Sequence, residues 1–100
     1  MEEHYANIAA VVTDVVRKYD ISEVYLFGSY ARGEQTPQSD IDLRFVCGPS
    51  ITFGDLYDIS LELETRLCAQ VEIVTNPLEK MRSRFRDCIM KDEVQLYEAA

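Results

Sequence analysis

The segment at residues 40–46 constrains the fold more than any other, because its polar and apolar side chains alternate. Such alternation has the period of a β-strand and predicts a strand whose two faces differ in chemistry. Every second position is apolar: Ile41, Leu43 and Phe45. Asp40 and Asp42 share the opposite face. The strand therefore offers an apolar face to packed helices and an acidic face to solvent.

Regular patterns continue along the rest of the chain. Apolar residues at three- and four-residue steps predict helices, and short β-branched or aromatic runs predict strands. The expected elements are a helix at residues 2–19, a strand at 23–27, a helical turn at 30–33, a loop at 34–39, the strand at 40–46, a helix from Thr52 to Cys68, a strand at 70–75, a helix from Asn76, and a closing strand at 94–97.

Length and charge narrow the possible functions. A chain of 100 residues fits one domain spanning residues 1–100, and an enzyme of this size has little material for a separate acceptor-binding module. Eighteen acidic against ten basic residues, a net charge of −8, argue against binding to nucleic acid backbones. Solubility, a basic protein partner or a metal site remain as reasons for the acidic charge.

The start of the chain and its cysteines indicate a cytoplasmic protein. Residues 1–4 lack the basic flank and apolar stretch of a signal peptide, and no apolar run is long enough to span a bilayer. Three widely spaced cysteines (Cys47, Cys68 and Cys88) do not form a disulfide framework, so we expect small core residues. Zinc is not expected, since His4 is the only histidine.

A glycine–serine pair follows the strand at residues 23–27. Gly28 allows the backbone to approach a ligand closely, and the free N–H groups at a helix start bind phosphates. The Ser29 hydroxyl adds a donor. Taken alone, the pair is weak evidence for a phosphate-binding loop, because most such pairs are ordinary turns with a cap.

Carboxylates are the other chemical feature. Asp40 and Asp42, on one face of a strand, repel each other unless a cation lies between them, and Mg²⁺ suits such oxygen ligands. Glu72 lies between Val71 and Ile73 and faces away from them. If its strand pairs beside residues 40–46, three carboxylates converge as two-metal phosphoryl transfer requires. The alternative is a solvated sheet edge.

The combined motif resembles a known family. Gly28-Ser29-x-Ala31-Arg32-Gly33, a short spacer and Ser39-Asp40-x-Asp42-Leu43 are similar to the signature of the DNA polymerase β-like nucleotidyltransferase superfamily. The chain looks more narrowly like a minimal nucleotidyltransferase, a group commonly encoded beside a HEPN-domain protein. This resemblance implies an α+β fold, in which a small mixed β-sheet carries helices on one face and the active site on the other.

The resemblance also implies residue roles. Gly28 and Ser29 would hold the β- and γ-phosphates of the nucleotide, while Asp40 and Asp42 would bind two Mg²⁺ ions. Glu72 would be the third catalytic and metal-binding acid, which is usually Asp in the family, and its longer side chain must fold back.

Three further polar residues have open roles. Arg32 either supports the phosphate loop or the contact with the partner, or forms a structural salt bridge. Ser39 either contacts the nucleotide or caps the loop. Arg44 shares the acidic face and could neutralise Asp42 or contact a phosphate. Basic residues at positions 80–91 form either a solvated helix or a nucleotide or partner surface.

The implied reaction is transfer of AMP from ATP to a tyrosine hydroxyl of a HEPN ribonuclease toxin, which makes this chain the antitoxin. ATP as the substrate and the toxin as the partner rest on the resemblance alone. The alternative is a catalytically degenerate nucleotidyltransferase that neutralises its partner by binding alone. The intact Gly28, Ser29, Asp40 and Asp42 favour the enzyme, and Glu72 keeps the alternative open.

Overall fold

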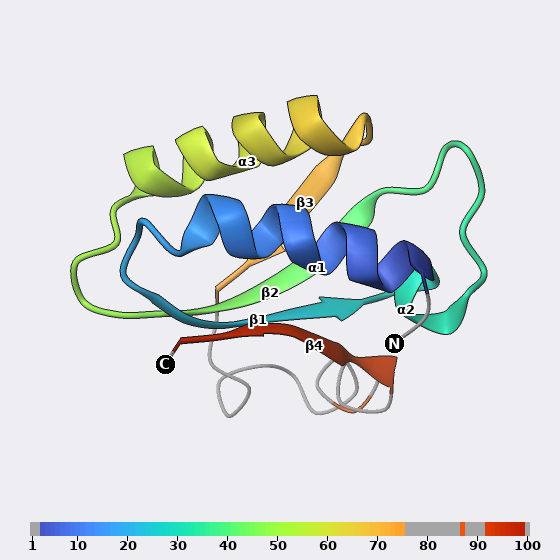
Figure 1. Cartoon of the computed structure of the whole chain (residues 1–100), viewed down its shortest axis with the longest axis horizontal. Helices are drawn as coiled ribbons and strands as arrows, with labels where there is room; N and C mark the ends of the chain where they lie inside the picture. The colour runs from blue at the N-terminus through green and yellow to red at the C-terminus, as the bar shows by residue number, and fades with distance from the viewer. Residues whose placement is uncertain (1–2, 76–86, 88–91, 100) are drawn as a thin grey trace.

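A four-stranded mixed sheet organises the molecule (Figure 1). The computed structural model describes residues 3–75, 87 and 92–99. In chain order the elements are α1 (Glu3–Val16), β1 (Ile21–Phe27), α2 (Ser29–Arg32), β2 (Ile41–Cys47), α3 (Phe53–Leu67), β3 (Val71–Val74) and β4 (Val94–Glu98). The strand order is β3-β2-β1-β4, where β1 pairs antiparallel with β2 and β4, and β2 pairs parallel with β3.

Helices α1 and α3 lie on the same face of the sheet (Figure 1). The core between these two layers is fully apolar, and its best-buried side chains come from both of them: Val12, Val15, Val16, Val24, Leu26, Ile41, Leu43, Phe45, Ile59 and Leu63. Ile41, Leu43 and Phe45 are the alternating positions of β2, so the expected apolar face is confirmed. The other face of β2 is left for polar side chains.

The expected α+β fold is confirmed, with small shifts at the ends of elements. Helix α1 ends at Val16 rather than at residue 19, and β1 begins at Ile21, two residues earlier than expected. Thr52 caps α3 in a reciprocal capping box, in which its side chain accepts from the N–H of Asp55 and the Asp55 carboxylate accepts from the N–H of Thr52. The closing strand β4 is confirmed. The helix expected from Asn76 lies outside the described residues, apart from Asp87. The basic residues at positions 80–91 lie outside them as well.

The cysteine expectation was partly wrong. Cys68 is exposed, because it is the C-cap of α3 and adopts a left-handed backbone with φ 54°. Cys47, at the end of β2, is half-buried, and burial raises the pKa of its thiol. Cys88 lies outside the described residues. Among the helices that the structure describes, none has the length and apolar character needed to cross a membrane.

Candidate active site

Gly28 forms a sharp turn between β1 and α2. Its backbone has φ 76° and ψ −155°, a conformation that residues other than glycine rarely adopt. A Cβ at this position would collide with the Oδ2 atom of Asp42. The backbone of the turn therefore lies directly against the Asp42 carboxylate, and only glycine permits this approach.

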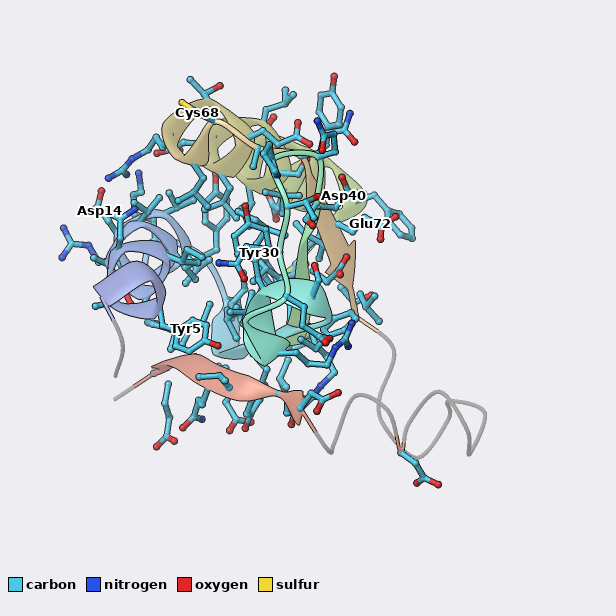
Figure 2. The ribbon with its side chains drawn as sticks, turned by 90° about the vertical axis from the view of Figure 1, so that its right-hand side faces the viewer. Tyr5, Asp14, Tyr30, Asp40, Cys68 and Glu72 are labelled. Carbon is cyan, nitrogen blue, oxygen red and sulfur yellow. The ribbon has the colours of Figure 1, made fainter. Side chains whose placement is uncertain are left out.

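Asp42 and Glu72 face each other across the parallel pair β2 and β3. They are direct partners in the strand register, which brings their carboxyl groups close together. Partial burial, hydrogen bonding with Glu72 and repulsion from Glu72 and Asp40 raise the pKa of Asp42 to about 6. The expected pairing of the Glu72 strand beside residues 40–46 is confirmed. Figure 2 shows Asp40 and Glu72 at the same edge of the molecule.

The donor set of this edge fits a magnesium ion. Among the described residues, no three His, Cys, Asp or Glu side chains form a group that could hold a metal ion. Mg²⁺ usually takes only one or two protein carboxylates and completes its shell with water and substrate phosphates. Asp42 and Glu72 supply two such carboxylates, and Asp40 adds negative charge beside them. A divalent cation would relieve the repulsion that raises the pKa of Asp42.

Arg32 and Ser39 flank the acids and already have protein partners. The Arg32 Nε donates to Glu34 Oε1 at 3.0 Å, and its Nη1 lies 3.6 Å from Asp92 Oδ2. The hydrogen bond with Glu34 raises the pKa of Arg32. The Ser39 hydroxyl accepts from the N–H of Thr36 at 2.8 Å, so it caps the loop before β2. Arg32 thus forms the salt bridges, and Ser39 the loop cap, that were one of the two hypotheses for each residue.

Arg44 contacts neither Asp42 nor open solvent. Its side chain is only 7% exposed and binds Glu93 through two hydrogen bonds of 2.9 and 3.1 Å. The guanidinium also stacks over Tyr25, with 4.4 Å from its carbon to the ring centroid. We therefore correct the expectation that Arg44 neutralises Asp42 or reaches a phosphate: its charge is committed to Glu93.

Asp92 and Glu93 are the site residues that sequence reasoning missed. Each binds an arginine beside the acidic pair: Asp92 contacts Arg32 and Glu93 contacts Arg44. Their only signal is a pair of consecutive acids directly before the closing strand. Tyr5 was also missed. Its hydroxyl donates to the carbonyl of Ala31 at 2.7 Å and so links α1 to α2.

Geometry thus brings together a glycine turn, an uncapped short helix and a carboxylate pair. Ser29 begins α2 directly after Gly28, and no side chain of the described part of the chain caps the start of that helix. Asp42 touches the turn and binds Glu72, while Asp40 precedes β2. Such a site can bind a phosphate at the turn and a cation at the acids.

Sequence relatives of the chain carry one kind of name. An archaeal chain of Methanocaldococcus jannaschii named "Putative protein adenylyltransferase" is 35% identical over 80 residues, covering 76% of this chain and 86% of its own length. A second chain with that name from the same organism is 40% identical over 60 residues, covering 58% and 60% of the two chains.

Several solved structures have a fold similar to that of this chain. A chain described as a putative minimal nucleotidyltransferase has a TM-score of 0.75 and 27% identity over 92% of both chains. A toxin–antitoxin structure with AMP-PNP has a TM-score of 0.73 at 22% identity, covering 91% of this chain and 73% of its own. A tri-AMPylated Shewanella oneidensis HEPN toxin in complex with MNT antitoxin has a TM-score of 0.68 at 18% identity, covering 95% and 73%.

The similarity to the last two structures shows a shared fold. The family is shown by a family model that matches most of the chain. The family model described as "Polymerase beta, Nucleotidyltransferase" matches residues 11–100, which include the glycine turn and all three acids. The chain therefore belongs to the polymerase beta nucleotidyltransferase family.

Proposed function

We propose that this chain is a Mg²⁺-dependent protein adenylyltransferase that transfers AMP from ATP to a tyrosine hydroxyl of a HEPN-type toxin. One observation carries the proposal: the Gly28 backbone lies directly against Asp42, and Asp42 is the strand-register partner of Glu72. A phosphate held at the turn would therefore sit beside the carboxylates. The names of the sequence relatives support protein adenylylation, and the toxin–antitoxin structures support a HEPN partner in a hetero-oligomer.

The residues of the chain would divide the work as follows. The backbone at Gly28 and the Ser29 hydroxyl would hold the triphosphate. Asp42 and Glu72 would hold the cation, with the negative charge of Asp40 beside them. Bound Mg²⁺ supplies neutralisation of the triphosphate charge. Most of the rate in such transfers comes from positioning and electrostatics. The close approach of the Gly28 turn to Asp42 would supply the positioning.

The transfer itself is a substitution at the α-phosphorus of ATP. A bond forms between the tyrosine oxygen and the α-phosphorus, and the bond between that phosphorus and the oxygen bridging to the β-phosphorus breaks. Pyrophosphate leaves with the bonding electrons, and the tyrosine proton passes to the Glu72 carboxylate or to solvent. Arg32 and Ser39, on either side of the acids, would complete the nucleotide side of the site.

A second function keeps the same partner without the chemistry. The family resemblance implies an Asp as the third acid, where this chain has Glu72, and Glu72 forms a carboxyl pair with its register partner Asp42. This pair would weaken catalysis if Glu72 cannot turn toward a cation. The chain would then neutralise the toxin by binding alone.

Intact-mass measurement separates these two functions. The purified chain, ATP, Mg²⁺ and the HEPN-type protein are mixed, and the mass of the HEPN-type protein is followed. Adenylylation predicts a gain of one or more AMP groups that disappears with Asp42→Asn. A tight complex without any mass gain would refute the enzyme and support the binder.

A further inference from the structure

The outer side of α3 carries a line of exposed apolar side chains. Phe53 is 91% exposed, Tyr57 64% and Leu61 45%, while Ile59 and Leu63 of the same helix are fully buried in the core. Four-residue spacing places the three exposed side chains next to one another along the helix surface. Single exposed apolar residues are common, but a contiguous row indicates a surface that another molecule covers. We call Phe53, Tyr57 and Leu61 the α3 row.

A hollow continues this row at its Phe53 end. It has a volume of about 380 Å³, and Cys47, Ile51, Leu56 and Thr75 line it together with Phe53. Asp42 is near the start of β2 and Cys47 is its last residue, so the two positions are about 16 Å apart along the strand. The hollow is therefore separate from the candidate active site, and it can receive a protruding side chain of a partner.

An exposed acidic side chain borders the α3 row. Helix α3 contains four acidic residues, Asp55, Asp58, Glu62 and Glu64, and Asp58 is the exposed one among them. The other three are engaged within the chain: Asp55 in the capping box, Glu62 with Arg66 at 3.7 Å, and Glu64 as acceptor from the N–H of Val71 at 3.0 Å. Asp58 precedes Leu61 by three residues and is its neighbour on the helix surface.

This charge pattern distinguishes between possible occupants. In a symmetric dimer through the α3 row, the acids of one copy would face those of the other, and like charges across an interface are costly. A partner with Lys and Arg around an apolar anchor would complement both the hollow and its acidic border. Aromatic and aliphatic anchors in such pockets carry most of the binding energy of an interface.

We propose that the α3 row and its hollow are the docking surface for the acceptor protein, which inserts an apolar side chain surrounded by basic residues. This inference rests on the proposed function, because the acceptor is the HEPN-type protein of that proposal. Docking away from the reacting atoms would set acceptor specificity, while the Gly28 turn and the acids act on ATP.

The test compares binding and transfer for a surface variant. In the full chain, Phe53→Ser/Tyr57→Ser should weaken binding to the HEPN-type protein by about 30-fold or more in calorimetric titration, as expected for loss of central anchors. At a saturating concentration of that protein, the rate of transfer and the KM for ATP should stay within about twofold of the wild type, since the site is unchanged. An unchanged Kd overturns the proposal.

Two charge reversals provide a matched pair. Asp58→Lys and Glu98→Lys change the net charge equally, but Asp58 borders the α3 row and Glu98 lies on β4, at the opposite edge of the sheet. Asp58→Lys should slow association with the HEPN-type protein and reduce its salt dependence, whereas Glu98→Lys should have little effect. Equal effects of the two variants overturn the electrostatic part of the inference.

Other occupants give different results. Wild-type dimers that become monomers in Phe53→Ser/Tyr57→Ser, seen by light scattering, would assign the row to a second copy and overturn the proposal. A fall of several degrees in the Tm of a monomeric variant would place the row within the fold of this chain, with the same consequence. If Phe53→Ser/Tyr57→Ser weakens binding but the HEPN-type protein gains no mass, only the proposed transfer is refuted. If that protein gains mass and its binding does not depend on the α3 row, only the docking surface is refuted.

Discussion

Replacing Glu93 by Ala tests how the arginine beside the acids is held. Glu93 binds the Arg44 guanidinium through two hydrogen bonds of 2.9 and 3.1 Å, and the two side chains are 15% and 7% exposed. Glu93→Ala leaves the guanidinium buried without its counter-charge. Because Tyr25 still lies under the guanidinium carbon at 4.4 Å, part of the stabilisation of the charge remains.

The magnitude follows from these contacts. Removing one partner of a buried ion pair costs about 3–5 kcal/mol, and the retained cation–π contact offsets about 1 kcal/mol. We therefore expect Glu93→Ala to lower the free energy of unfolding by about 3 kcal/mol. In Arg44→Met/Glu93→Met both charges are replaced by apolar side chains, so this variant should unfold within about 1 kcal/mol of the wild type.

Urea denaturation at neutral pH measures both variants. A loss of about 3 kcal/mol shifts the midpoint by on the order of 1 M urea for a small domain. Glu34→Ala is the control, because its pair with Arg32 is exposed and its loss should cost no more than about 0.5 kcal/mol. The reasoning is refuted if Glu93→Ala costs no more than Glu34→Ala, or if the double variant is less stable than Glu93→Ala.

Three further predictions concern the site and α3. Asp42→Asn should stabilise the metal-free chain by about 1 kcal/mol at pH 7.5 but not at pH 4. The folded state raises the pKa of this part-exposed carboxyl from 3.8 to about 6, so ionisation above that pH destabilises the fold. Thermal melts in EDTA check this, and a less stable variant at pH 7.5 would contradict it. Gly28→Ala should cost about 1–3 kcal/mol in urea denaturation, more than Gly33→Ala, since both have positive φ but only the Gly28 methyl group meets Asp42; equal losses would contradict this. Thr52→Ala should cost about 1 kcal/mol by removing the side-chain half of the α3 capping box, and an unchanged urea midpoint would argue against that cap.

Local patterns were sufficient for most of the elements. The alternation in β2 and the Thr52 cap of α3 depend on residues a few positions apart, so their chemistry is readable along the chain. The order of the strands is different, because pairing joins segments far apart in sequence. Whether the Glu72 strand lies beside β2 was a condition in the sequence argument and became a fact only with the register of Asp42 and Glu72.

In the candidate site, too, residue types could be identified from the sequence, whereas contacts between distant residues could not. Gly28, Asp42 and Glu72 were identified from their residue types and positions, and the structure brings them together. Arg44 was placed on the correct face but given the wrong neighbour. Its partner Glu93 is 49 positions away, and no periodicity relates the two residues. The exposed α3 row was also missed, because the sequence does not show which apolar residues of an amphipathic helix remain uncovered.

The proposed reaction is tested most directly by the origin of the phosphorus that reaches the acceptor. Two reactions of the chain with Mg²⁺ and the HEPN-type protein would use ATP labelled either at the α-phosphorus or at the γ-phosphorus. AMP transfer predicts label on the HEPN-type protein from α-labelled ATP only, with loss of that label in Asp42→Asn. Label from γ-labelled ATP, or no label from either, would contradict the account.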